Sequence, residues 1–410
     1  MQEHSRYAVG IDVGTKMVRC VIGHIDAETG VTKIIGVGEV PNSGMRKGMV
    51  SHLTGPAAAI DKVLELVERM SGHQVNDATV SINGTHILST KANGMIAVGT
   101  NDTEVTEDDV ARLEEMATTG KVPANREILE IVPYSYRLDG QDIKDPVGMT
   151  GARMELRANV VSALKPYVAH LRKSAEMAKV TMTSVVPSVL ASARAVLTES
   201  QLENGVAVID IGGATTGVAV FEEGDLQHVA VIPMGAQNVT NDLAIGLKTD
   251  PEVAEQVKLT HARFGQTTPG EVETKYEKQT YLFEQTDIDE IVEARYEEIF
   301  ELIARELEKA GGIGHLPSGV VLVGGGARIE GLVPFAKTHL RLAAKLGVPR
   351  GYGGASDGVE RPEFAAAVGL MLIDGSGAHE MPGGEPLLKK SNEITKKAGG
   401  LLQKLLAKFK

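Results

Sequence analysis

The sequence predicts an α/β protein built from two related halves, and three observations support this fold class. A strand that ends in Asp-x-Gly and turns into a second strand occurs twice, once near the N-terminus and once near the middle of the chain. A later buried-type strand runs into three consecutive glycines. The chain has 410 residues, 42% of them hydrophobic and 46 of them glycine, which is too long for one core and rich in tight turns.

The repeated motif is a β-branched strand, an Asp-apolar-Gly turn and a returning strand. Its first copy covers residues 7–16 and continues into the alternating stretch 17–22, and its second copy covers 206–216 and continues into 217–221. Each pattern is typical of two strands joined at a glycine turn. One copy alone would be an ordinary hairpin, but two similar copies, one in each half, favour a shared function.

The residue types at the two turns are those of a phosphate-binding loop. Glycine lets backbone N–H groups approach phosphate oxygens, threonine hydroxyls add donors, and lysine adds a positive charge. The candidate nucleotide-binding residues of the two loops are Gly14, Thr15, Lys16, Gly212, Gly213, Thr215 and Thr216.

Two aspartates, Asp12 and Asp210, stand at the strand ends directly before these turns. Mg²⁺ prefers one or two carboxylates and keeps several of its waters. We therefore expect both aspartates to hold Mg²⁺, largely through water, and they are also the candidate catalytic residues.

The third element covers residues 318–332 and reads as a buried strand, three glycines and the start of a helix. Gly324, Gly325 and Gly326 would let a flat ring or a ribose approach the backbone closely. A strand followed by three glycines is a weak signal alone, and its value lies in its order after the two loops.

Composition and charge exclude several other classes of protein. The net charge of −12 argues against a nucleic-acid partner. The single cysteine, Cys20, lies in an apolar stretch, which indicates a core residue and a reducing compartment. There is no N-terminal signal, no apolar run near the roughly 18 residues that span a bilayer, no P-loop and no metal-ligand spacing of His or Cys.

The order of the three glycine-rich elements resembles the actin, Hsp70 and sugar-kinase superfamily. The resemblance implies two ribonuclease-H-like halves with ATP between them. Residues 186–193 look like the first connection between the halves, and 364–370 look like the second, where small residues let two helices cross closely.

Other segments narrow the resemblance to the FtsA family of bacterial cell-division actin homologues, over about residues 6–373. The segments that resemble its inserted subdomain are 80–87, 104–110, 126–136 and 145–153. The stretches 232–244 and 254–258 look like its fourth subdomain. The resemblance adds Gly235 to the nucleotide site and implies that Glu255 and Lys258 lie beside the ribose and adenine.

The same resemblance implies a division into four subdomains and a tail. The expected bounds are 1–79, 161–201 and 360–374 for subdomain 1A, 80–160 for the inserted 1C, 202–229 and 301–359 for 2A, 230–300 for 2B, 375–392 for a linker and 393–410 for an amphipathic helix.

The sequence departs from the family pattern in three ways. Ala236 and Gln237 replace a glycine and an asparagine. The segment 275–289 is rich in Gln and Glu, and the basic residues that often support the partner site are not evident there. Filament-forming relatives carry an acidic residue before the proline of the first connection, where this chain has Val185 and Val186. Valine cannot polarise water, so we expect tight ATP binding and at most slow hydrolysis.

The last segment, 393–410, has the pattern of a helix that lies in a membrane interface. The large apolar residues that fall within about a 140° arc are Ile394, Leu401, Leu402, Leu405, Leu406 and Phe409. The lysines on the opposite side include Lys396, Lys397, Lys404 and Lys408. The alternative is a helix that docks on the body of the protein or on a partner.

Two further features concern protein partners. By resemblance, the subdomain around Arg295 and Tyr296 receives the C-terminal peptide of the tubulin-like division protein FtsZ, although the helical spacing there also fits a simple core stripe. The acidic stretch 106–116 reads as a solvated helix face, and in the family its subdomain contacts the next filament subunit.

The leading hypothesis is therefore an ATP-binding, actin-like cell-division protein that polymerises. It would tether FtsZ filaments to the cytoplasmic face of the bacterial membrane at the division septum, alongside other divisome proteins. The alternatives are a small-molecule kinase of the same superfamily and a pilus-assembly actin-like protein.

Overall fold

The computed structural model describes residues 6–98, 104–265, 268–354 and 358–376. Residues 377–392 of the predicted linker and the amphipathic helix, with all of its apolar and lysine positions, lie outside these residues. The first residue of the predicted linker, Gly375, is the last residue of a helix. Within the described ranges, no helix is long and apolar enough to cross a membrane.

The first half is built on a six-stranded sheet in the order β11-β6-β1-β2-β3-β19. Its strands are β1 (Arg6–Val13), β2 (Met17–Ile25), β3 (Thr32–Pro41), β6 (Asp77–Ile82), β11 (Thr181–Pro187) and β19 (Gly353–Gly354). β1, β2 and β3 form an antiparallel meander, and β6 and β11 run parallel to β1. The helices α1 (Thr54–Ser71) and α3 (Lys165–Met177) pack together on this half, and a short hairpin of β4 (Met45–Arg46) and β5 (Met49–Val50) follows the meander.

The second half repeats this strand order in a five-stranded sheet, β14-β13-β12-β17-β18. Its strands are β12 (Val206–Ile211), β13 (Thr216–Glu222), β14 (Asp225–Ile232), β17 (Val320–Val323) and β18 (Ala344–Leu346). Again the first three form an antiparallel meander and the last two run parallel to the first. The helices of this half are α5 (Glu199–Asn204), α6 (Ala236–Gly246), α7 (Pro251–His261), α8 (Gln285–Lys309) and α9 (Leu332–Leu340).

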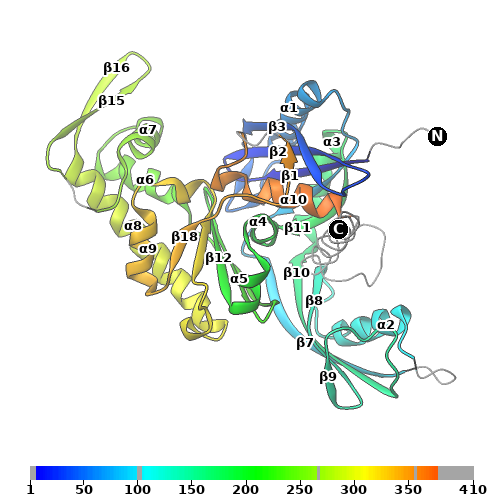
Figure 1. The fold of residues 1–410 in the computed structure, drawn as a ribbon. Coiled ribbons are helices and arrows are strands. Elements are labelled where there is room, and N and C mark those ends of the chain that lie inside the picture. Colours follow the sequence, from blue (N-terminus) through cyan, green and yellow to red (C-terminus); the bar gives the residue numbers. More distant parts are fainter. Residues whose placement is uncertain (1–5, 99–103, 266–267, 355–357, 377–410) are drawn as a thin grey trace, which may run out of the picture.

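Two helices, α4 (Ser188–Val196) and α10 (Ala365–Gly375), lie between the two sheets (Figure 1). α10 packs on β1 and β2, α4 packs on β12 and β13, and the two helices pack on each other. Their crossing depends on Gly369, because a Cβ there would be 1.8 Å from the carbonyl oxygen of Ala191. The expectation that small residues let these helices cross closely is confirmed.

An inserted lobe follows β6 and returns to the first half at α3; it is drawn in cyan to green in Figure 1. Its sheet has the order β7-β10-β8-β9. The strands are β7 (Leu88–Ala97), β8 (Arg126–Leu138), β9 (Gln141–Ile143) and β10 (Arg153–Leu164), and α2 (Glu107–Thr118) packs on β7 and β10. The sheet also contacts β14 of the second half.

The acidic face predicted on α2 is only partly solvated. Glu107, Asp108 and Glu115 are exposed, but Asp109 is buried, where it forms a capping box with Thr106. Glu114 is also buried, and burial raises its pKa to about 7. The prediction is therefore wrong for these two carboxyls, because their positions face the lobe's own sheet.

The remaining elements lie around the second half and its connection to the first. The hairpin of β15 (Glu271–Tyr276) and β16 (Gln279–Glu284) stands at the far end of the second half (Figure 1). Three short 3₁₀ turns are η1 (Ile313–His315), η2 (Gly325–Arg328) and η3 (Pro362–Phe364). Cys20 is fully buried in the core of the first half, as its apolar setting predicts.

Candidate functional site

The first predicted loop is the turn between β1 and β2. The amide of Gly14 donates to the carbonyl of Met17 at 3.0 Å, which closes the turn. Asn42 supports the turn from outside. Its side-chain Nδ2 donates to the carbonyl of Gly14 at 2.7 Å, and its main-chain N–H donates to the carbonyl of Lys16 at 2.8 Å. The amide of Gly48, in the β4–β5 hairpin, donates to Thr15 Oγ1 at 3.2 Å.

The second predicted loop, between β12 and β13, closes with the same bond. The amide of Gly212 donates to the carbonyl of Thr215 at 2.9 Å. The start of α6 supports this loop through the backbone, because the amides of Ala236 and Gln237 donate to the carbonyls of Gly212 at 3.0 Å and Gly213 at 2.6 Å. Neither amide is therefore free at this helix terminus.

Gly235 is needed where α6 meets the second loop. A Cβ on Gly235 would lie 2.5 Å from the carbonyl oxygen of Gly212. Thr216 has a different role from the predicted one: it is fully buried, and its hydroxyl donates to the carbonyl of Met234 at 2.9 Å. The prediction of Thr216 as a ligand contact is wrong, since this hydroxyl holds the loop instead.

The two loops lie close together although they come from different halves. A Cβ built on Gly213 would be 3.0 Å from Cγ of Lys16. Asp12 and Asp210, one before each loop, are also close enough for the charge of Asp12 to raise the pKa of Asp210. The structure therefore brings the two sequence motifs to one place.

Each aspartate accepts a hydrogen bond from a buried serine. Ser81 Oγ, at the end of β6, donates to Asp12 Oδ1 at 2.7 Å, and Ser192 Oγ, on α4, donates to Asp210 Oδ2 at 2.9 Å. Burial raises the pKa of both carboxyls, to about 6 for Asp210, while the positive charge of Arg19 acts in the opposite direction.

The paired carboxylates fit a divalent cation. A cation beside them would offset the cost of burying the Asp210 carboxylate and its repulsion from Asp12, the two effects that raise the pKa of Asp210. No cluster of three or more His, Cys, Asp or Glu side chains suited to a metal occurs in the described part of the chain. The protein would therefore supply these two carboxylates, and water or phosphate oxygens would complete the coordination, as Mg²⁺ favours.

The third glycine element joins the second loop. Gly324 adopts φ +85°, and a Cβ there would be 2.5 Å from Asp210 Oδ1. A Cβ on Gly325, in contrast, would have no neighbouring atom within 4 Å, so this backbone faces open space. The backbone here can be approached by a flat group.

Glu255 and Lys258 form a partly buried ion pair on α7. Lys258 Nζ donates to Glu255 Oε2 at 2.7 Å, to Thr240 Oγ1 at 2.8 Å and to the carbonyl of Ala236 at 3.2 Å. Burial alone would raise the pKa of Glu255, but Lys258 and Thr240 hold it below its ordinary value. The charge of Lys16 acts on both partners, so the pair lies near the two loops.

The supports of the site were not predicted from the sequence. Asn42, Ser81 and Ser192 are distant from the glycine motifs along the chain, whereas Arg19 lies in the strand that follows the first motif. Each belongs to a common residue type. The one available signal was the position of Ser81 at the end of a strand parallel to β1, where side chains meet the same edge of the sheet.

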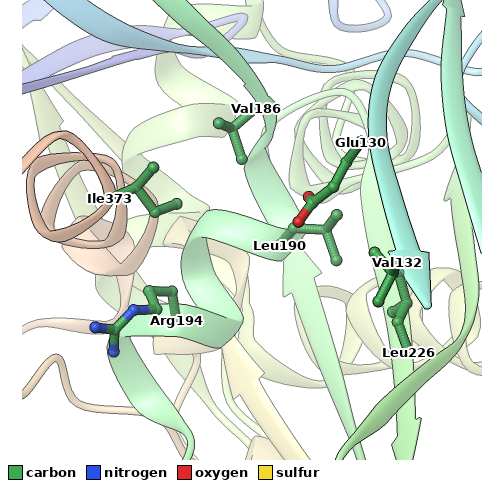
Figure 2. Close-up of a pocket in the computed structure, with 7 residues that line it drawn as sticks. All are labelled: Glu130, Val132, Val186, Leu190, Arg194, Leu226 and Ile373. Atoms are coloured by element: carbon green, nitrogen blue, oxygen red, sulfur yellow. The ribbon is translucent and has the colours of Figure 1, made fainter. Parts of the chain in front are cut away.

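The position expected to lack a water-polarising acid borders a cavity of mixed character. Val186 lines this cavity together with Leu190 and Ile373 (Figure 2). Its other lining residues are Glu130, Val132, Arg194 and Leu226, so the cavity lies where the inserted lobe meets both halves. No residue of the two loops lines it.

The two predicted partner residues differ from each other, and Tyr296 contacts the third glycine element of this site. Arg295 is paired with Asp242, at 2.5 Å from Nε, and with Glu298, and Asp242 raises its pKa. Tyr296 is fully buried, and its hydroxyl donates to the carbonyl of Gly326 at 2.7 Å. The prediction of a partner contact is therefore wrong for Tyr296, and the core stripe is correct there.

Comparison with protein families gives two matches. Residues 207–369 match the family described as "Cell division protein FtsA", and residues 84–162 match "SHS2 domain inserted in FTSA". The chain is 32% identical to the cell division protein FtsA of Pseudomonas aeruginosa, over 90% of this chain and 89% of that protein. It is 34% identical to that of Bacillus subtilis, over 88% and 82%.

Solved structures support the fold. The structure titled "PilM-PilN type IV pilus biogenesis complex" matches with a TM-score of 0.66 at 16% identity, covering 90% of this chain and 98% of that one. MreB5 of Spiroplasma citri bound to ADP matches with a TM-score of 0.53 at 12% identity, covering 92% and 100%. The predicted actin-like fold with an inserted subdomain is confirmed.

Proposed function

Because this chain belongs to the FtsA family of cell division proteins, we propose that it is an ATP-dependent filament protein that tethers FtsZ to the membrane. A role in cell division and the actin-like fold follow from the family itself. ATP and Mg²⁺ binding, polymerisation, FtsZ binding and attachment to the cytoplasmic face at the septum are the proposed steps.

The observation that carries ATP binding is the meeting of two like phosphate loops, each preceded by an aspartate that accepts a hydrogen bond from a buried serine. Backbone N–H groups and Lys16 would bind the phosphates, and Asp12 and Asp210 would hold Mg²⁺. Mg²⁺ would neutralise phosphate charge when bound. The open backbone at Gly325 and the Glu255–Lys258 pair would accept the nucleoside.

We expect ATP to serve as a switch for assembly, with slow hydrolysis. Val185 and Val186 occupy the place where an acid would orient water, and the side chain of Val186 is buried. Water orientation supplies much of the catalysis of phosphoryl transfer. A turnover of ~1 per second or faster, typical of a kinase, would contradict this expectation.

Membrane attachment is proposed from the sequence of the tail. Between Lys389 and Lys410 the chain carries seven lysines and one acid, whereas its overall net charge is −12. Six large apolar side chains on one helix face would contribute roughly 9–18 kcal/mol of gross burial. Lysines near anionic lipid would add about 1 kcal/mol each.

Binding to FtsZ is proposed from family membership, and the second half around Arg295 is the expected region. Glu298 on this side of α8 is exposed and Arg295 is partly exposed, so a peptide could contact them, while Tyr296 supports the helix from the core.

The test is electron microscopy on anionic lipid monolayers with ATP and Mg²⁺, using the full chain and the chain without residues 391–410. Filaments on the lipid that are lost with the tail support polymerisation and anchoring together. Equal liposome co-sedimentation of both chains would contradict the anchor. Failure of immobilised FtsZ C-terminal peptide to retain the protein would contradict the tether.

The same preparation separates the two alternatives. Transfer of the γ-phosphate from ATP to small acceptors would favour a kinase. Polymerisation that does not depend on lipid, together with no binding to FtsZ, would favour a pilus-assembly protein. That alternative is supported only by a shared fold at 16% identity.

A further inference from the structure

A second small cavity lies directly behind the first phosphate loop. Its wall includes Ser81, Gly48, His86 and Tyr167. Ser81 is the residue that donates to Asp12 Oδ1, and Gly48 is the one that donates to Thr15 Oγ1. Two supports of the first loop therefore stand on the wall of one cavity.

His86 lies on this wall at the point where the chain leaves the six-stranded sheet of the first half and enters the inserted lobe. It follows β6 and precedes β7, and its side chain is only 6% exposed. The ring stacks on Tyr167 of α3, with centroids 4.5 Å apart and planes 15° apart. Burial lowers the pKa of His86 to about 4, so the ring is neutral at pH 7.

The main chain of His86 is joined to the inserted sheet by Arg126. Arg126 Nη2 donates to the carbonyl of His86 and, at 2.9 Å, to that of Ser162, while Nε donates to Ser162 Oγ at 3.0 Å. Arg126 is the first residue of β8, and Ser162 lies near the end of β10, opposite the first residue of β7. The guanidinium of Arg126 therefore links β8, β10 and the segment before β7 at the end of the lobe that joins the first half.

We propose that His86 and Arg126 are positioning residues that couple the state of the first phosphate loop to the inserted lobe. The proposal rests on the proposed ATP binding. A shift of Thr15 or Asp12 on binding Mg²⁺ and phosphate would move Gly48 and Ser81 at the cavity wall. A displacement of Gly48 would reach His86 by contact through Gly84. A Cβ on Gly48 would be 3.0 Å from the amide nitrogen of Gly84, and a Cβ on Gly84 would be 3.0 Å from Cδ2 of His86. Arg126 then carries the displacement to β7, β8 and β10.

The test compares hydrogen exchange of the full chain with and without Mg²⁺ and ATP, for the unaltered protein and for Arg126→Met. In the unaltered protein, ATP is expected to slow amide exchange in β7 and β8. Arg126→Met should keep an ATP dissociation constant within about threefold by calorimetry. It should lose more than half of the exchange difference in the lobe.

The matched control is Arg157→Met, which makes the same chemical change at an exposed position of β10 and should keep the full difference. If Arg126→Met does not fold, Tyr167→Leu removes the stack at a partly buried site and should also reduce the difference. Retention of the full difference in the folded variant overturns the proposal, as does an unaltered protein that binds ATP without any change in the lobe. Absence of ATP binding in the unaltered chain removes instead the proposed function on which it rests.

Discussion

The two halves of the molecule use the same sheet and the same loop, but they support the loop differently. Both sheets place their strands in the same order, and both loops close with a glycine amide that donates to the carbonyl three residues later. The second loop is supported by main-chain bonds from α6. The first is supported by the side chain and the main-chain amide of Asn42 and by a bond from the short β4–β5 hairpin.

From this difference we expect the first loop to be less constrained than the second. A helix terminus holds its amides in a rigid array, because the helix keeps them in place. A two-residue strand pair and one side-chain amide impose less constraint. The first loop also belongs to the half that carries the inserted lobe. The two halves therefore differ most in the parts that would respond to a ligand.

The largest expected effect concerns the contact that joins the halves. Gly369→Ala should lower the free energy of unfolding by about 3 kcal/mol, because the new methyl overlaps the Ala191 carbonyl and separates α4 from α10. Urea unfolding measures this. Gly314→Ala, whose new Cβ has no atom within 4 Å, is the control and should unfold like the unaltered chain. Equal stability of both variants would show that the helix crossing adjusts freely.

The second prediction tests whether both halves serve one cation. Asp12→Asn and Asp210→Asn should each weaken ATP binding in the presence of Mg²⁺ by about thirtyfold, or ~2 kcal/mol, because the serine hydrogen bond can be kept while the charge is lost. Calorimetry with Mg²⁺ and with EDTA separates the metal contribution.

The control for these variants is Asp61→Asn, an exposed change on α1 that should leave affinity unaltered. A loss confined to one aspartate would mean that only one half holds the cation.

The third prediction sharpens the difference in support. Gly235→Ala should lower stability by about 1–2 kcal/mol, since its methyl would meet backbone atoms of the second loop. Gly213→Ala should change it by less than about 0.5 kcal/mol, because its nearest neighbour is the flexible Lys16 side chain. Thermal unfolding without nucleotide compares the pair, and equal losses would argue against a rigid second loop.

The smallest expected effect is a pH dependence. The folded protein raises the pKa of Asp210 from 3.8 to about 6, so the folded state holds this proton more tightly than the unfolded state. The corresponding stabilisation is complete below pH 3.8 and is lost as pH rises through 6. The stability of the unaltered chain relative to Asp210→Asn should therefore fall across this window.

Subtracting the variant removes the contribution of Glu114, whose pKa is also raised, and of other carboxyls. Mg²⁺ with ATP should reverse the trend above pH 6. A flat difference in the nucleotide-free protein would mean that neither burial nor the charge of Asp12 raises the pKa of Asp210.

Sequence predicted the loops well because their signals are local. An aspartate, a glycine and a β-branched strand form one turn, and the turn is as expected at both Gly14 and Gly212. Packing of small residues at the helix crossing was also predictable, since Gly369 has no Cβ to keep Ala191 away. Tyr296 shows the limit: its helical spacing fits a core stripe as well as a partner site, and only burial decides between them.

The sequence by itself determined the fold class, the two loops and their aspartates, because each depends on residues within one turn or one strand. Only the tertiary structure decided what stands behind them. Ser81, Ser192 and Asn42 reach the loops from separate elements, and Thr216 turns its hydroxyl inward to Met234. Hydrogen bonds between distant segments depend on how the elements pack, and no local pattern records that packing.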